Sequence, residues 1–470
     1  MVVETDYLVV GAGATGLAFV DALVAESDVE VTIVDRQAAT GGHWLRAYPF
    51  VRLHTPSAYY GVNSLPLGED RIDQAGENAG YYERATGGEV RDYFAQAAAR
   101  LVQTGRVRLL TGHEHLGGGG QGEQVRDLGT GRLHDVLVRR KVVDARYLES
   151  SIPATHTPEF EVAADARVVP VNDLPAAAHP GASYAVLGSG KTSADACSWL
   201  LGKGVEPERI RWIRPRDAWF YDRRHWQPLD QVATIMDGLS LDAEAGARAA
   251  DVEDLFARLE ASGRLVRIDP SAPATMYRGT MLSAGELDGL RQIDDVVRLG
   301  RVARIAADRI TLERGEVPTG PGVLHVDCTA RGLNNAPGTA IFQPGRIVLQ
   351  QVRYLSPCFN AALIAFVEAH RDDDTDKNRL CPSTPYPSRI DDLPRLMCTT
   401  WTAEANWLSE PDLATWMSAS RLNLMRALPD HAAEPSAQTA VKRYLTHVGT
   451  AIERMSNWGQ PASHERRPGT

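Results

Sequence analysis

The sequence contains few cysteines, no long apolar run and no excess of positive charge, and each absence excludes a class of protein. Its 470 residues include five cysteines, and no two of them are close in sequence. This spacing excludes a disulfide framework and a C-x-x-C redox or zinc site, so we expect five reduced thiols. No stretch of eighteen apolar residues occurs, and no basic segment precedes an apolar run at the N-terminus. These absences predict a soluble, cytoplasmic protein without a membrane partner.

The charge balance excludes a further class of partner. Lysine and arginine number 50 against 60 aspartates and glutamates, which gives a formal net charge of −10. An acidic protein of this kind binds nucleic acid poorly, so we expect no nucleic-acid partner. A chain of 470 residues, of which 43% are hydrophobic, is long enough for two or three domains with large cores.

The most informative stretch of the chain lies near its start. Residues 7–10 are apolar and β-prone, and residues 29–34 form a second apolar run that ends at Asp35. Between the two runs, apolar residues recur at helical spacing after three glycines in G-x-G-x-x-G order, Gly11, Gly13 and Gly16. This succession of strand, glycine loop, helix, strand and acid predicts a dinucleotide-binding unit.

Each part of this unit has a physical role toward a bound dinucleotide. The first glycine permits a tight turn, the second lets the backbone approach a pyrophosphate, and the third lets the helix pack closely on the strand. The helix that begins near Ala14 points its free N–H groups at the phosphates. Asp35 can accept hydrogen bonds from a ribose diol, and we include its neighbour Arg36 among the candidate binding residues.

A short turn, "GGHW" at 41–44, follows the acid. At this point the chain resembles the flavin-containing monooxygenase (class B) group of two-dinucleotide flavoproteins. That group has its first glycine loop near the N-terminus, an acid at the end of the second strand and a G-G-x-W turn soon after. The resemblance implies that the first loop binds FAD and that Gly42, His43 and Trp44 belong to the same site.

A second glycine-rich stretch, "SYAVLGSGKTSADACSWLL" at 183–201, has two interpretations. From Ala185 it is one residue short of the phosphate-binding loop of ATPases, but the preceding strand would then fall on "PAAAHPGAS", whose prolines argue against it. From Gly188 it is one residue short of the dinucleotide fingerprint, and a good strand precedes it. We therefore predict a second dinucleotide site at Gly188, Ser189, Gly190, Lys191 and Thr192. The stretch also resembles the second loop of the flavin monooxygenases, G-x-G-x-S-G-x-D, with Asp195 in the place of the acid.

The end of the next strand favours NADPH over NADH. An acid there would favour NADH through the ribose hydroxyl, whereas a 2′-phosphate needs cationic, bidentate partners. The sequence places Arg214 and Arg216 there, with no acid before Asp217, and Lys191 could add charge from the loop. The alternative for both arginines is an ordinary solvated strand end.

Two such loops predict an α/β fold with two dinucleotide-binding (Rossmann-like) domains, the second inserted in the first, and a helical C-terminal region. We assign residues 1–180 and 321–390 to a discontinuous FAD-binding domain. Residues 181–320 are assigned to an NADPH-binding domain, which carries a partly helical insertion at 228–290. Residues 391–470 are expected to form a helical cap that shapes the substrate pocket or a subunit contact, as in a homodimer.

One helix after the return to the first domain has a predicted role. The stretch "PCFNAALIAFVEA" at 357–369 is typical of a helix, with Pro357 in its first turn and Ser356 as its cap. In the resembled superfamily such a helix aims its positive dipole end at the flavin. The alternative is a simple packing helix.

The resemblance implies a monooxygenase that uses FAD, NADPH and O2. In this family a flavin C4a-peroxide transfers one oxygen atom to a small organic substrate, and the protein positions and shields the cofactors. Candidate catalytic residues are Arg52 and His54, in the stretch "AYPFVRLHTPSAYYGVNSLPL" at 47–67, which is expected to line the flavin. For His54, an ordinary packed histidine is an equal alternative.

Other functions stay open or are excluded on the residues present. A disulfide reductase would need a redox-active cysteine pair near the flavin, and the sequence shows none. An FAD-dependent oxidase or dehydrogenase without oxygen transfer stays open, because only His156 matches the F-x-G-x-x-x-H motif of the family. A nucleotide-sensing protein without catalysis also stays open. We expect no metal site, because His113 and His115 have no further ligands nearby.

Overall fold

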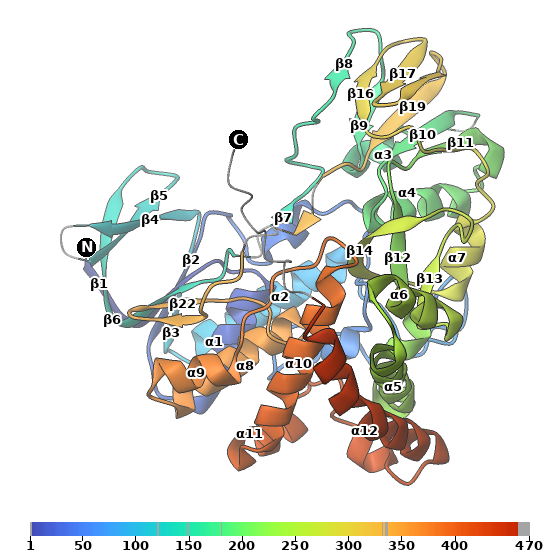
Figure 1. Cartoon of the computed structure of the whole chain (residues 1–470). Helices are drawn as coiled ribbons and strands as arrows, with labels where there is room; N and C mark the ends of the chain where they lie inside the picture. Colours follow the sequence, from blue (N-terminus) through green and yellow to red (C-terminus); the bar gives the residue numbers. More distant parts are fainter. Residues whose placement is uncertain are drawn as a thin grey trace, which may run out of the picture.

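We describe the fold from a computed structural model, which covers residues 2–119, 122–147, 150–179, 181–330, 332–333 and 337–458. In Figure 1 the first sheet lies on the left, the second sheet lies at the upper right, and α10, α11 and α12 form the lower part of the molecule. No helix in the described ranges is long and apolar enough to cross a membrane.

The first sheet carries the N-terminal glycine loop. Its strand order is β21-β22-β6-β1-β2-β3, and a β4–β5 hairpin pairs onto β6 through β5. The strands β1, β2, β3, β6 and β22 pair with one another in the parallel sense. The pairs β21–β22, β4–β5 and β5–β6 are antiparallel. The strands are β1 (Val2–Val10), β2 (Val31–Asp35), β3 (Val107–Thr111), β4 (His113–Gly119), β5 (Gly122–Asp127), β6 (Leu133–Asp144), β21 (Phe342–Gln343) and β22 (Arg346–Val348).

Three helices accompany the first sheet: α1 (Ala14–Glu26), α2 (Gly87–Gln103) and α8 (Pro357–His370). The apolar residues that follow the glycines bury α1 almost completely, and α1 packs against α8. Helix α8 begins at Pro357 as predicted, but Ser356 does not cap it, because its hydroxyl donates to the Tyr354 carbonyl instead.

The second sheet is wholly parallel, with the order β15-β11-β10-β19-β9. Its strands are β9 (Val168–Pro170), β10 (Ser183–Leu187), β11 (Ile210–Ile213), β15 (Val296–Val297) and β19 (Val323–Asp327), and its helices are α3 (Leu174–Ala177), α4 (Lys191–Gly202) and α7 (Ala284–Leu290). The sheet also includes β19 and β9, which lie just outside the range 181–320 that the sequence assigns to the second domain. Strand β19 hydrogen-bonds to the central strand β10, and β9 hydrogen-bonds to β19.

Smaller sheets and short helices complete this half of the chain. One sheet joins β8 (Glu161–Val162), β16 (Val302–Ile305), β17 (Arg309–Leu312) and β18 (Gly315–Pro318), and β7 (Ser150–Ser151) pairs with β20 (Gly332–Leu333). The 3-10 helices are η1 (Gly42–Arg46), η2 (Ser57–Tyr59), η3 (Val171–Asp173), η4 (Pro207–Arg209), η5 (Arg223–Trp226), η6 (Leu229–Gln231) and η7 (Leu428–His431).

The insertion and the C-terminal helices share one core. The insertion contains α5 (Ala233–Arg248) and α6 (Val252–Ala261) beside a sheet of β12 (Asp217–Asp222), β13 (Leu265–Arg267) and β14 (Ala274–Leu282). The C-terminal helices are α9 (Asp374–Leu380), α10 (Asp392–Leu408), α11 (Pro411–Ala419) and α12 (Pro435–Met455). Helix α12 lies along α5, where a Cβ on Gly246 would meet the Met455 side chain at 2.9 Å. Within the predicted cap, α12 therefore packs on the insertion of the second domain (Figure 1). Trp407 of α10 and Trp416 of α11 instead contact Phe359 of α8.

Candidate functional site

The first glycine loop adopts a conformation that only glycine allows. Gly11 has a φ of +116°, and its N–H donates to the Val34 carbonyl at 2.8 Å. A Cβ on Gly16 would lie 2.0 Å from the Gly11 carbonyl oxygen, which explains the need for glycine where helix α1 meets strand β1. Helix α1 begins at Ala14 without a side-chain cap, so no capping side chain satisfies the first N–H groups of the helix.

The GGHW turn packs directly on this loop. The Gly41 N–H donates to the Ala12 carbonyl at 2.9 Å, and a Cβ on Gly42 would lie 3.1 Å from the Gly13 Cα. The Trp44 indole is buried and donates to the Tyr60 hydroxyl at 2.9 Å, whereas His43 is exposed. The glycine loop and the GGHW turn therefore form one cradle of backbone atoms, which a side chain at Gly13 or Gly42 would narrow.

Asp35 connects the second strand to the same loop. Its two carboxylate oxygens accept hydrogen bonds from the backbone N–H groups of Ala12 and Gln37, both at 2.7 Å. Each oxygen keeps a further lone pair, which can accept a hydrogen bond from a ribose hydroxyl. The binding of a ribose diol by Asp35 stays a prediction. Arg36, beside it, is exposed. The cradle, the uncapped helix and the acid fit the pyrophosphate and ribose of a dinucleotide such as FAD.

The second glycine loop repeats this arrangement with more space. Gly188 has a φ of +135°, and a Cβ there would lie 2.8 Å from the Cys328 carbonyl oxygen. A Cβ on Gly190 would meet nothing within 4 Å, so the approach to the start of α4 is open. Ser193 stands in the place of the third glycine and is fully buried, with its hydroxyl donating to the Gly190 carbonyl at 2.8 Å. The half-buried Ser189 and Thr192 complete the loop.

Two predicted phosphate-binding cations are paired with acids inside the protein. Lys191 is 6% exposed, and its ammonium contacts the carboxylates of Asp195 and Glu286. Arg214 is 3% exposed and pairs with Asp217 at 3.0 Å, with its guanidinium over the Trp212 ring. A buried cation needs such partners because desolvation is costly. The structure therefore places neither cation at the open surface of the loop.

Arg216 is the exposed arginine at this strand end. Its backbone N–H donates to the Ser189 hydroxyl at 3.3 Å, which ties the backbone at this position to the second loop. No carboxylate of the described residues lies within ion-pair distance of its guanidinium, which contacts the Met276 sulfur at 3.7 Å. Partial burial and three neighbouring cations, Arg278, Arg301 and Arg389, lower the pKa of Arg216.

The arginines around Arg216 come from distant parts of the chain, and the sequence analysis missed all three. Arg278 lies in β14, Arg301 precedes β16, and Arg389 precedes α10. The backbones of Met276 and Arg389 form a β-bridge, which brings the third arginine to the second domain. Arg389 and Arg301 also have acidic partners, Asp391 at 2.8 Å and Glu159 at 4.0 Å. No local sequence pattern could have found this cluster, because its members are separated by long stretches of chain.

Of the two candidate catalytic residues, His54 contacts the second domain, because its carbonyl accepts a hydrogen bond from Arg223 at 3.2 Å. His54 is half-buried, and burial together with Lys191, Arg223 and Arg84 lowers its pKa to about 4. The histidine is therefore neutral near pH 7. Arg52 is exposed and donates to the Arg84 carbonyl at 3.0 Å. Its catalytic role and that of His54 stay predictions.

The five cysteines and the histidines near the glycine-rich hairpin have ordinary structural contacts. All five cysteines are free and buried, and Cys358, near the start of α8, accepts a hydrogen bond from the Gly61 N–H at 3.4 Å. His113 contacts the Thr111 carbonyl, and His115 contacts Glu123. In the described part of the chain, no group of three or more His, Cys, Asp or Glu side chains could hold a metal ion.

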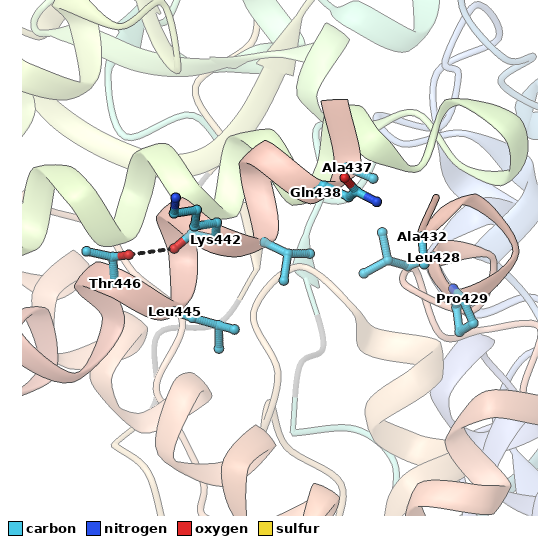
Figure 2. Close-up of a pocket in the computed structure, with 9 residues that line it drawn as sticks. Leu428, Pro429, Ala432, Ala437, Gln438, Lys442, Leu445 and Thr446 are labelled. Atoms are coloured by element: carbon cyan, nitrogen blue, oxygen red, sulfur yellow. Dashed lines mark hydrogen bonds between the residues drawn. The ribbon is translucent and has the colours of Figure 1, made fainter. Parts of the chain in front are cut away.

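A surface pocket lies away from both loops. It has a volume of about 640 Å³ and is formed by α12 and the segment around η7, with lining residues Leu428, Pro429, Ala432, Ala437, Gln438, Val441, Lys442, Leu445 and Thr446 (Figure 2). It contains no residue of the glycine loops, the GGHW turn or the arginine cluster. We therefore do not assign it to a cofactor.

Comparisons with known proteins agree with this architecture. Residues 9–61 match the model of the NAD(P)-binding Rossmann-like domain family. The uncharacterized protein Rv2000 of Mycobacterium tuberculosis strain H37Rv is 42% identical over 458 residues, which cover 97% of this chain and 84% of Rv2000. Protein Mb2023 of Mycobacterium bovis, also uncharacterized, matches to the same extent.

Solved structures show the same fold at low sequence identity. An open crystal structure of cyclohexanone monooxygenase aligns with a TM-score of 0.51 and 14% identity, over 94% of this chain and 98% of that one. A cyclohexanone-bound structure in a rotated conformation aligns with a TM-score of 0.50 and 13% identity, over 95% and 99%. The predicted fold class is thereby confirmed.

Proposed function

This chain belongs to the family of the mycobacterial protein Rv2000 and has the fold of cyclohexanone monooxygenase, and from these premises we propose that it is an FAD- and NADPH-dependent monooxygenase. The observation that carries the proposal is the pair of glycine loops, each between a parallel strand and an uncapped helix, on two separate sheets. Two dinucleotides can therefore bind to one chain. The substrate of the proposed reaction is a small organic molecule, to which one oxygen atom of O2 is transferred.

The residues present support an assignment of the two sites. The cradle of the first loop and the GGHW turn would hold the FAD pyrophosphate, with Asp35 at the ribose. Gly188, Gly190 and the start of α4 would hold the NADPH pyrophosphate. Arg216 is best placed for the 2′-phosphate, because its side chain is exposed, its backbone is hydrogen-bonded to the loop and it has cationic neighbours. When bound, FAD would accept a hydride from NADPH and deliver the electrons to O2.

The protein's own contribution to the chemistry is to orient and shield the cofactors. His54 and Tyr48 belong to the segment 47–67. This segment follows the GGHW turn in sequence and contacts α4 of the second domain. A neutral His54 offers one donor and one acceptor and adds no positive charge to the site. All five cysteines are free, and burial raises the pKa of each thiol. No disulfide of the described residues is therefore available to accept the electrons.

An isotope experiment tests the proposal and separates it from the oxidase alternative. The purified protein is reduced with NADPH without oxygen, then mixed with ¹⁸O₂ and a panel of small ketones, amines and thioethers. We expect a yellow protein that NADPH bleaches and that places one ¹⁸O atom in a product. Recovery of all oxygen as hydrogen peroxide would favour an FAD-dependent oxidase or dehydrogenase. A colourless protein that takes up no FAD would refute both.

A further inference from the structure

A cluster of buried charges joins the two halves of the site. Three cations, Arg84, Lys191 and Arg223, converge on the carboxylate of Glu286, at 3.6, 3.2 and 2.6 Å respectively. Lys191 also pairs with Asp195, one helical turn further along α4. We name these five residues the interdomain ion cluster. Each of its cations is at most 7% exposed, and Glu286 is 2% exposed.

The members of the cluster come from both sides of the domain boundary. Arg84 donates to the Leu53 carbonyl, and Arg223 donates to the His54 carbonyl at 3.2 Å, so both hold the segment 47–67. Lys191 and Asp195 begin α4, directly after the second glycine loop. Glu286 itself is fixed by a reciprocal capping pair with Ser283 at the start of α7.

Further contacts cross the same boundary and depend on the same alignment. The Tyr48 hydroxyl donates to Asp195 at 2.6 Å. The Phe50 ring stacks on the Trp199 ring of α4, with centroids 5.2 Å apart. The segment that is expected to line the flavin is therefore attached to the helix that is expected to hold NADPH.

We propose that Glu286 is a positioning residue, which sets the place of the second dinucleotide loop relative to the segment 47–67. The cluster contains three cations and two carboxylates, and Glu286 is the carboxylate that all three cations share. Without its charge, only Lys191 would keep a carboxylate partner within ion-pair distance among the described residues, Asp195. The repulsion among the three buried cations would then push α4 away from the segment 47–67. Hydride transfer needs the reacting atoms about 3–3.5 Å apart, so a shift of about 1 Å can cost about a hundredfold in rate.

The first test of this inference does not depend on any cofactor. Hydrogen–deuterium exchange of the FAD-free protein is compared for wild type and Glu286→Gln, in peptides that cover 47–67 and 191–202. We expect faster exchange in both segments of the variant, with unchanged exchange in strands β1 and β2. The matched control is Glu368→Gln, because Glu368 is also a buried carboxylate between two lysines, Lys141 and Lys377, but lies within the first domain.

The second test rests on the proposed function and measures flavin reduction. At saturating NADPH, we expect Glu286→Gln to lower the reduction rate constant about tenfold to a hundredfold while FAD content stays unchanged. The milder variant Tyr48→Phe removes one crossing bond and leaves every charge, so we expect a smaller loss in the same direction. Glu368→Gln should leave the rate constant unchanged.

The outcomes separate this inference from the function on which it rests. If NADPH does not reduce the wild-type protein, the proposed function fails, and the exchange experiment alone decides the role of Glu286. If Glu286→Gln exchanges like wild type in both segments, or if Glu368→Gln disturbs the same two segments, the positioning role is refuted. Should Glu286→Gln not fold, the inference stands or falls with Tyr48→Phe, and unchanged exchange in that variant would overturn it.

Discussion

The substitution Gly13→Ala should separate FAD binding from folding. An added Cβ at Gly13 would meet only Gly42 backbone atoms, at 3.5 and 3.8 Å, which is ordinary van der Waals contact. The φ of Gly13 is −83°, a value that alanine adopts without strain. Because Gly13 precedes helix α1 at its cap position, alanine should cost the fold no more than about 1 kcal/mol.

We expect the same Cβ to narrow the space between Gly13 and Gly42, where the backbone would approach the pyrophosphate of the proposed FAD. Each charge-assisted hydrogen bond that is lost costs about 1.5–3 kcal/mol, so the Kd for FAD should rise roughly tenfold to a hundredfold per bond. The assay titrates the FAD-free protein with FAD by flavin fluorescence and compares urea unfolding of the FAD-free forms.

Two other glycines provide the controls for this experiment. Gly190→Ala adds a Cβ that meets nothing within 4 Å, so both the fold and FAD binding should be unaffected. Gly16→Ala places its Cβ 2.0 Å from the Gly11 oxygen, so it should lower the stability of the FAD-free protein by about 1–3 kcal/mol. An unchanged Kd for FAD in Gly13→Ala would refute the assignment of the first loop.

Three further predictions follow from the site. Arg216→Ala should weaken NADPH binding roughly tenfold to a hundredfold and leave NADH binding unchanged. Equal dissociation constants of the wild-type protein for NADPH and NADH would contradict this role of Arg216. Arg214→Ala should mainly lower the free energy of unfolding, by up to about 3 kcal/mol. The pKa of His54 in the folded protein, about 4, lies below its ordinary value of 6.5. As the pH falls from 6.5 toward 4, the unfolded chain therefore binds the proton first, and the folded protein loses up to about 1.4 kcal/mol of stability per pH unit. Urea unfolding of His54→Asn at several pH values should show a smaller loss of stability with falling pH. Arg421 donates to three carbonyls in 58–62, within the segment that is expected to line the flavin. Arg421→Met should therefore raise the Kd for FAD about tenfold, as measured by flavin fluorescence. An unchanged Kd would contradict a role of Arg421 in holding this segment for FAD.

The position of Lys191 shows what a local pattern cannot predict. Its place in the second loop suggested a free cation for a phosphate, yet Glu286, 95 residues away, accepts from it in the folded protein. Arg214 is similar, because its partner Asp217 also binds Arg298, which directly follows β15 in a distant part of the chain. In both cases burial demands a charged partner, and the identity of that partner depends on chain segments that only the fold brings together.

The sequence alone determined the two units of strand, glycine loop, helix and strand, because glycine spacing, strand and helix periodicity and the acid at the end of β2 are local features with a local physical cause. It also placed the start of α8 at Pro357, whose fixed φ suits a first helical turn. Only the tertiary structure decided which cations are free. Arg216 stays exposed among arginines from β14 and from the segments before β16 and α10, while Lys191 and Arg214 are buried against acids. The reason is that the cost of burying a charge is set by everything packed around it, and most of those neighbours are remote in sequence.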